Sequence, residues 1–125
     1  MLADARVEAT VPTTDLERAA QFYGDVVGLR PGGSLPPRSD LIYELAGGAT
    51  LLVYEHDSAP PPRLTFVHFV VDDVAGTVRD LRARGVPFDE YDLPELKTED
   101  AVATVGDHHF AWFRDPDDNV LEIRD

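Results

Sequence analysis

The hydrophobic and polar positions of this chain follow the same order twice. Residues 6–12 alternate as a half-buried strand does, and apolar residues then recur at three- and four-residue spacing before a glycine. Residues 64–71 are β-branched and aromatic, and the helical stripe after them also ends at a glycine. The first stripe is Leu16, Ala19, Ala20, Tyr23 and Val27 before Gly28, and the second is Val74, Val78 and Leu81 before Gly85. The repetition predicts two similar halves related by an approximate twofold axis.

Polar residues precede both helical stripes. Thr14 and Glu17 have the spacing of a capping box, which predicts that the first helix begins there. Asp72 and Asp73 are expected to cap the second helix. The glycine after each stripe favours the left-handed conformation that ends a helix. Each half therefore contains one helix with a single apolar face.

The remaining segments complete each half. Residues 40–46 and 49–55 predict a hairpin around Gly47 and Gly48, and residues 31–33 and 36–37 are typical of loops. In the second half, residues 86–91, 108–114 and 120–124 predict strands and 115–119 a turn. Residues 92–106 predict a long loop that either stays irregular or partly extends into a strand, and it is a candidate lid. We expect one α+β domain over residues 1–125, with βαβββ modules at 1–57 and 64–125 and a proline-rich linker at 58–63.

Strand alternation divides the predicted strands into two sets of side chains. One set is apolar: Val7, Ala9, Val11, Leu51, Val53, Val67, Phe69, Val71, Leu121 and Ile123. The other is mixed: Glu8, Thr10, Leu52, Tyr54, His56, Phe66, His68, Val70, Val120, Glu122 and Arg124. Because two helices cover only one side, we expect the apolar set to lie beneath them. The mixed set then either lines a ligand cavity or forms a solvated face.

Composition narrows the possible partners. The net charge of −13 over 125 residues repels phosphate backbones, which argues against nucleic acid, and it is compatible with a cationic ligand or with solubility alone. The absence of cysteine excludes disulfides and thiolate metal sites. No apolar run approaches the roughly 20 residues of a membrane span, and the first residues lack the pattern of a signal peptide. We therefore expect a cytoplasmic protein without a membrane partner.

The internal repeat also indicates candidate chemistry. Glu8 and Phe66 precede the helix caps at equal intervals, and Leu52 and Glu122 match in the last hairpin of each half. These four positions predict a centre in which only Glu8 and Glu122 offer oxygen ligands. If the two carboxylates lie close in half-apolar surroundings, repulsion and desolvation raise the pKa of at least one, which makes them candidate catalytic residues.

Aromatic and imidazole side chains provide candidate ligand contacts. The mixed set places Tyr54, His56, Phe66 and His68 with the two glutamates. Since His108 and His109 point to opposite faces, only one of them can join this group, and Trp112 shares its parity with His108. We therefore include Trp112 as an aromatic wall of the site.

Three segments resemble the vicinal oxygen chelate superfamily, which includes glyoxalase I, extradiol dioxygenases, fosfomycin-resistance enzymes and bleomycin-resistance proteins. They are residues 11–29, residues 70–86 and the closing run Phe113-Arg114-Asp115-Pro116-Asp117-Asp118-Asn119-Val120-Leu121-Glu122. The resemblance implies two βαβββ modules that form a curved, mostly antiparallel sheet with helices on its convex face, and a homodimer that completes two cavities. Asp118 stands where that family commonly has glycine, so we expect slight local strain there.

The resemblance also implies a depleted metal centre. Glu8 and Glu122 match ligand positions of the metal-dependent members, whereas Phe66 stands where a histidine is usual, and His68 is the substitute. The leading expectation is a small-molecule-binding protein that binds or sequesters an antibiotic-like or cationic organic ligand without a cofactor. The alternative is a divalent-metal-dependent lyase, isomerase or dioxygenase of the glyoxalase type, with Glu8, His68 and Glu122 as ligands.

Overall fold

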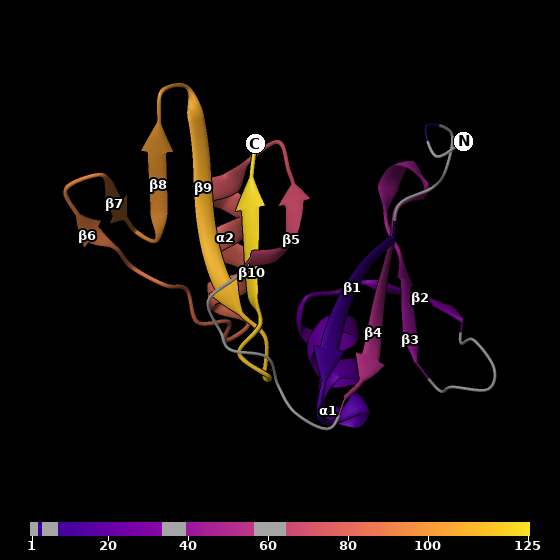
Figure 1. Cartoon of the computed structure of the whole chain (residues 1–125). Coiled ribbons are helices and arrows are strands. Elements are labelled where there is room, and N and C mark those ends of the chain that lie inside the picture. Colours follow the sequence, from indigo (N-terminus) through magenta and orange to yellow (C-terminus); the bar gives the residue numbers. More distant parts are fainter. Residues whose placement is uncertain (1–2, 4–7, 34–39, 57–64) are drawn as a thin grey trace. The chain divides into compact units, whose positions relative to one another are not determined.

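The computed structural model describes residues 3, 8–33, 40–56 and 65–125 (Figure 1). The chain divides into two compact units, Met1–Pro61 and Pro62–Asp125, called unit 1 and unit 2. The linker expected at residues 58–63 lies outside the described residues. Each unit is described by itself.

The described part of unit 1 contains a helical segment, a short 3-10 turn and four strands. Its elements are β1 (Glu8–Thr13), α1 (Leu16–Ala20), the π-helical turn η2 (Gln21–Val26), β2 (Arg30–Gly33), β3 (Leu41–Glu44), the short 3-10 turn η3 (Ala46–Gly48) and β4 (Thr50–Glu55). The sheet order is β1-β4-β3-β2, with β1 parallel to β4 and the other pairs antiparallel. The hairpin predicted around Gly47 and Gly48 is confirmed. The loop predicted at residues 31–33 is wrong, because these residues pair with β3 as strand β2.

Unit 2 repeats this arrangement with an additional hairpin. Its elements are β5 (Thr65–Val70), α2 (Val74–Ala83), β6 (Asp92–Leu93), β7 (Leu96–Glu99), β8 (Val102–Val105), β9 (His108–Arg114) and β10 (Val120–Arg124). The sheet order is β5-β10-β9-β8-β7-β6, and only β5 and β10 pair in parallel. The strands predicted at 108–114 and 120–124 are confirmed.

Two predictions for unit 2 are wrong. Residues 86–91 form no strand but an isolated bridge between Phe88 and Phe113. Residues 92–106, expected to be mainly a loop, form β6, β7 and β8. Asp100 and Ala101 both adopt positive φ, 49° and 67°, between β7 and β8. Two consecutive residues of this kind make the tight turn that matches the twist of antiparallel strands.

The helix starts are set by aspartates. Asp73 caps α2 as predicted, and its Oδ1 accepts a hydrogen bond of 3.0 Å from the Gly76 amide. The capping box predicted from Thr14 is wrong. Asp15 caps α1 instead, and its side chain accepts from the Arg18 amide at 3.1 Å. Asp15 is the more favourable cap because its carboxylate also interacts with the positive end of the helix.

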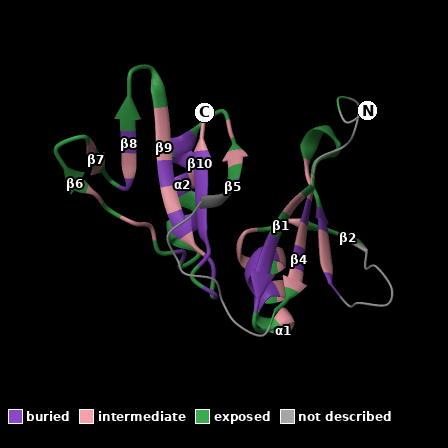
Figure 2. Ribbon diagram, viewed as in Figure 1, coloured by how far each residue is buried: buried purple, intermediate pink, exposed green. Residues whose placement is uncertain are grey.

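Burial confirms the two sets of strand side chains. The apolar set contributes Val11, Leu51, Val53, Val67, Leu121 and Ile123 to the buried core. Figure 2 shows β10 buried along most of its length, and Figure 1 shows α2 lying across one face of the unit 2 strands. The mixed set is more exposed, although Val120 and Glu122 are buried. The predicted α+β class with a βαβββ repeat is therefore confirmed.

No helix in the described ranges combines the length and the apolar character needed to cross a lipid bilayer.

Candidate functional site in unit 2

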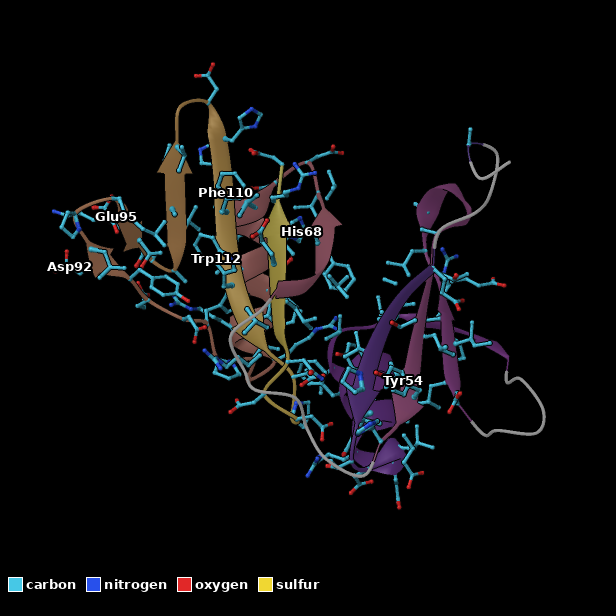
Figure 3. The ribbon with its side chains drawn as sticks, in the orientation of Figure 1. Tyr54, His68, Asp92, Glu95, Phe110 and Trp112 are labelled. Carbon is cyan, nitrogen blue, oxygen red and sulfur yellow. The ribbon has the colours of Figure 1, made fainter. Side chains whose placement is uncertain are left out.

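The register of three neighbouring strands brings His68, Glu122 and Trp112 side by side. Glu122 in β10 pairs with His68 in β5 on one side and with Trp112 in β9 on the other. Side chains of paired residues project from the same face of a sheet. Figure 3 labels His68 and Trp112 on the strands that flank β10. We call the surface that carries these three residues the mixed face of unit 2.

Glu122 is the buried centre of this group. Its residue is 8% exposed, although its side chain carries a carboxylate. The Trp112 indole Nε1 donates a hydrogen bond of 2.8 Å to Glu122 Oε2, and His68 Nδ1 lies 3.6 Å from Oε1. The first contact is a charge-assisted hydrogen bond, whereas the second has ion-pair distance only. Both carboxylate oxygens thus face a nitrogen, which offsets the cost of burial.

Aromatic rings extend the site along β9. The Phe110 and Trp112 rings stack with centroids 6.2 Å apart and planes 10° apart, and Tyr91 meets Trp112 edge-on at 5.5 Å. Burial, followed by the nearby Asp89 carboxylate, raises the pKa of the Tyr91 phenol. Tyr91 therefore stays a neutral phenol at physiological pH. Together the three rings form an aromatic platform beside Glu122.

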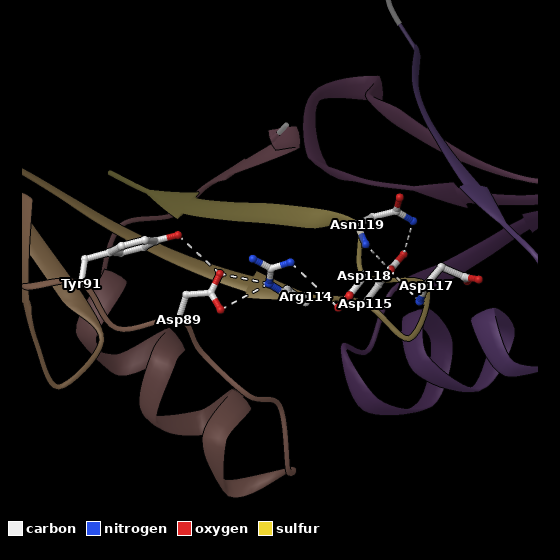
Figure 4. A network of polar contacts seen from close by, with 7 residues as sticks. All are labelled: Asp89, Tyr91, Arg114, Asp115, Asp117, Asp118 and Asn119. Atoms are coloured by element: carbon white, nitrogen blue, oxygen red, sulfur yellow. Dashed lines mark hydrogen bonds and ion pairs between the residues drawn. The ribbon is translucent and has the colours of Figure 1, made fainter. Parts of the chain in front are cut away.

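A polar network supports the β9–β10 turn (Figure 4). Arg114 Nε lies 3.2 Å from Asp89 Oδ2, and its Nη1 lies 3.9 Å from Asp118 Oδ1. Within the turn, buried Asp115 accepts hydrogen bonds from the Asp117 and Asn119 amides, each of 2.9 Å. These contacts fix the loop that joins the strands of Trp112 and Glu122. The turn is thus a supporting structure for the site.

Unit 1 carries the other predicted residues. Glu8 Oε2 accepts a hydrogen bond of 2.8 Å from the Thr50 hydroxyl, and the Tyr54 and His56 rings meet edge-on at 6.4 Å. Leu52 pairs with Thr10 as Glu122 pairs with His68, so the repeat is preserved in the register. The centre predicted from Glu8 together with Glu122 involves both units and stays a prediction.

Phe66 lies in β5 where the pairing with β10 changes register between Val120 and Leu121, and its side chain lies outside the described part. Sequence reasoning included Arg124 in the mixed set but omitted Phe110 and Tyr91 from the site. Phe110 could have been found by its parity with Trp112. Tyr91 follows no periodic strand, so the sequence offered no comparable signal for it.

The donors in unit 2 are insufficient for a metal site by themselves. His68 and Glu122 supply one imidazole and one carboxylate, and Glu122 Oε2 already accepts from Trp112. In the described ranges no three His, Cys, Asp or Glu side chains come together as a metal-binding group. A lyase or oxygenase centre needs about three protein ligands. The set Glu8, His68 and Glu122 therefore stays a prediction.

The cavities of unit 2 lie along β7 and β8. One of about 600 Å³ runs between α2 and the β7–β8 turn, past Val78, Arg82 and Asp100. A second of about 490 Å³ is lined by Tyr91, Lys97 and other residues of the β6–β8 segment. Arg82 is engaged there by Glu90 at 2.9 Å. We base the site on the contacts of Glu122, a buried carboxylate that faces both an indole and an imidazole.

The sequence matches a protein-family model over nearly its whole length. The model of the Glyoxalase/Bleomycin resistance protein/Dioxygenase superfamily matches residues 6–123. The chain belongs to this superfamily. The resemblance noted in the sequence is thereby confirmed, and the superfamily accounts for the repeated βαβββ units. No curated protein matches the chain in sequence.

Solved structures with the same fold cover nearly the whole chain. A glyoxalase/bleomycin resistance protein from Streptomyces sp. CB03234 is 25% identical, with 97% of this chain and 100% of that chain covered and a TM-score of 0.69. TnmS3, an antibiotic binding protein from Streptomyces sp. CB03234, is 26% identical, with 98% and 96% covered and a TM-score of 0.71. UcmS2, with 16% identity, 96% of each chain covered and a TM-score of 0.74, shares the fold.

Proposed function

We propose that the chain binds and sequesters a small planar organic ligand on the mixed face of unit 2, with a cationic or hydrogen-bond-donating group of the ligand directed at Glu122. The observation that carries this proposal is the aromatic pair Phe110 and Trp112 beside the buried Glu122 carboxylate. The pair offers a stacking surface, and the carboxylate offers charge.

The aromatic platform favours a flat ligand. Parallel rings on one face provide a surface on which a third ring can stack, and offset stacking adds about 0.5–1.5 kcal/mol beyond the area that is buried. Tyr91 stands perpendicular to Trp112 and limits the platform on one side. A planar molecule fits such a surface better than a branched aliphatic one.

Charge favours a cation. Glu122 is a carboxylate in half-apolar surroundings, and the chain as a whole carries a net charge of −13. A field of one sign raises the local concentration of ligands of the opposite charge. Trp112 holds one oxygen of Glu122, and the imidazole of His68 is 49% exposed and available to a ligand.

The comparison with TnmS3 supports sequestration. That protein is an antibiotic binding protein, and it is similar to this chain over 98% of the chain length. On the basis of this similarity, we propose that the ligand of the present chain is antibiotic-like. The homodimer and the cytoplasmic location expected from the sequence stay predictions, and sedimentation velocity would test the former.

Fluorescence provides a direct experiment because Trp112 is the only tryptophan in the chain. Proflavine, a planar cation, is expected to quench Trp112 and to bind more tightly than acridine, which is neutral in mildly alkaline buffer. Glu122→Gln should weaken proflavine binding about tenfold and leave acridine unchanged, since a charge-assisted contact contributes about 1.5–3 kcal/mol.

Glu95→Gln is the matched control. It removes the same charge from unit 2, but Glu95 lies between β6 and β7, on the far side of β8 from Trp112 (Figure 3). It should change proflavine affinity less than about twofold, as expected for a remote exposed charge. Equal losses of proflavine affinity in Glu95→Gln and Glu122→Gln would mean that net charge alone causes the effect. If the unaltered chain did not bind proflavine, the proposal would be refuted.

A metal-dependent reaction is the second candidate, and one observation favours it. His68 Nδ1 lies 3.6 Å from Glu122 Oε1, so an imidazole and a carboxylate are neighbours in the sheet. Glu8 would be the third ligand of a divalent ion that polarises two adjacent substrate oxygens. Near-stoichiometric divalent metal in protein purified without a chelator or affinity tag, lost in Glu122→Ala, would favour this reaction over sequestration.

A further inference from the structure

Arg124 carries an unsatisfied polar atom on the mixed face. Its Nε is buried and has no hydrogen-bond partner in the described part of the chain. Arg124 follows Glu122 by two positions in β10, so both side chains project from the same face. Its paired residues are Phe110 in β9 and Val70 in β5. The guanidinium thus belongs to the same surface as the aromatic platform.

An unpartnered N–H at this position is unfavourable. A buried donor without an acceptor loses the hydrogen bonds that water would have supplied, and the loss is larger for charged groups. Most buried polar side-chain atoms have a partner, so an exception requires an explanation. Guanidinium groups are suited to planar oxyanions such as carboxylates, which accept two parallel hydrogen bonds.

The carboxylates nearest in sequence are engaged elsewhere. Glu122 accepts from Trp112 at 2.8 Å and faces His68 at 3.6 Å. Asp125 accepts from the His109 amide at 2.8 Å and lies 2.7 Å from His109 Nδ1. Asp125 Oδ1 also lies 3.8 Å from His108 Nδ1, so both oxygens of this carboxylate already face nitrogens. Neither of these carboxylates therefore serves as the acceptor for Arg124 Nε.

We propose that Arg124 is an anion subsite that binds a carboxylate or phenolate of the ligand. The inference rests on the proposed function of the mixed face and deepens it. The ligand would place its planar body on Phe110 and Trp112, its acidic group at Arg124 and its donor group at Glu122. Residues two apart in a strand are separated by roughly 7 Å, which is the span of one substituted aromatic ring system.

The surroundings of Arg124 fit this role. Val70, its partner in β5, is 67% exposed although it is a large apolar residue. Phe110 lies on the other side, so the guanidinium stands between two apolar side chains. A ligand that covers Val70 would exclude water from the contact, and ionic hydrogen bonds are stronger where water is excluded.

Matched probes separate the two subsites. Naphthoate carries the acidic group, naphthamide is its neutral counterpart, proflavine tests Glu122, and an aminomethyl-naphthoate carries both charges. Calorimetric titration should show that Arg124→Gln weakens naphthoate and the zwitterion about tenfold or more, with naphthamide and proflavine changed less than about twofold. Arg124→Lys should fall between the two, because an ammonium keeps the charge but lacks the planar fork.

Arg79→Gln is the control for charge. Arg79 lies on α2, and its side chain is 77% exposed beside Asp80. The Arg79→Gln variant should therefore bind naphthoate as the unaltered chain does. If Arg124→Gln and the unaltered chain bound naphthoate equally well, the subsite would be overturned. If both still bound proflavine, the proposed function would stand. If the unaltered chain bound naphthoate but not proflavine, the proposed function would fail while the Arg124 subsite stood. Each failure is therefore distinguishable.

A second measurement avoids substitution altogether. In proton–nitrogen correlation NMR of the unaltered chain, the Arg124 Nε–H signal should shift on addition of naphthoate, because a carboxylate becomes its hydrogen-bond acceptor. A chemical shift typical of a hydrogen-bonded guanidinium before any ligand is added would mean that the protein itself supplies the acceptor, and the inference would fail. A signal that does not respond to naphthoate would overturn it as well.

Discussion

The Trp112 indole donates a 2.8 Å hydrogen bond to Glu122 across the β9–β10 pair. This contact connects the aromatic and acidic parts of the candidate site. Glu122 is buried, so its carboxylate depends on the donors that the sheet provides. An indole N–H can only donate, which fixes the direction of the bond. Trp112 is therefore both a stacking surface and the residue that holds Glu122 in place.

Trp112→Phe should destabilise the chain. The substitution keeps an aromatic ring beside Phe110 but removes the hydrogen bond to Glu122, and leaving a buried carboxylate with one donor fewer costs about 1–3 kcal/mol. Urea unfolding followed by circular dichroism would measure the loss. In a Glu122→Gln background the same substitution should cost less, because the charge is absent. Equal costs in both backgrounds would show that ring packing, not the hydrogen bond, accounts for the effect.

The cap of α2 should be coupled to Gly76. Asp73 Oδ1 accepts from the Gly76 amide, and a Cβ added at Gly76 would lie 2.9 Å from Asp73 Cγ. Gly76→Ala should therefore lack the gain of roughly 1 kcal/mol that helix propensity provides, because the methyl displaces the capping carboxylate. In Asp73→Ala protein the gain should appear. A similar gain in both backgrounds, measured by urea unfolding, would contradict the coupling.

Local sequence signals predicted the parts of the fold that local physics determines. The apolar stripe of α2 and its Asp73 cap follow from helical periodicity and side-chain capping, which act within a few residues. The strands β9 and β10 follow from alternation. Helix α1 was placed correctly, but two neighbouring polar residues compete for its cap, and Asp15 rather than Thr14 takes that position.

The pairing register of the strands could not be predicted from local sequence patterns. Comparison of the two halves grouped Phe66 with Glu122 in one centre, whereas the structure pairs Glu122 with His68, and the β5–β10 ladder shifts between Val120 and Leu121. Such an irregularity depends on packing between strands and leaves no mark in the spacing of residues. The three strands β6–β8, where we expected a loop with at most partial strand, escaped prediction for a related reason. Its largely exposed side chains lack the apolar alternation that identifies a half-buried strand.

Asp118 should be a site of stabilising substitution. Its φ of 66° lies in the left-handed region, and its amide donates to the Asp115 carbonyl at 3.0 Å. Asp118→Gly should raise the free energy of unfolding by up to about 1 kcal/mol, because glycine adopts this conformation without a Cβ clash. Asp118→Ala should lower it, because alanine tolerates positive φ less well than aspartate. Thermal unfolding of the two variants would give the signs.

Asp118→Asn serves as the charge control. Asparagine tolerates the same conformation, so this variant removes only the 3.9 Å ion pair with Arg114. It should leave stability nearly unchanged, since exposed ion pairs contribute about 0–1 kcal/mol. A loss in Asp118→Asn as large as in Asp118→Ala would assign the effect to charge and contradict the conformational explanation.

Acid should weaken the end of the β9–β10 pair through Asp125. Hydrogen bonds from the His109 amide and imidazole lower the pKa of the Asp125 carboxyl below its ordinary value of 3.8. Because the folded-state pKa is the lower one, this contact stabilises the fold fully above the unfolded-state pKa and is lost as the pH falls through the folded-state value. The difference in urea midpoint between the unaltered chain and Asp125→Asn should therefore shrink between about pH 5 and about pH 2. A difference that stayed constant over this window would mean that the Asp125 charge contributes nothing to the contact.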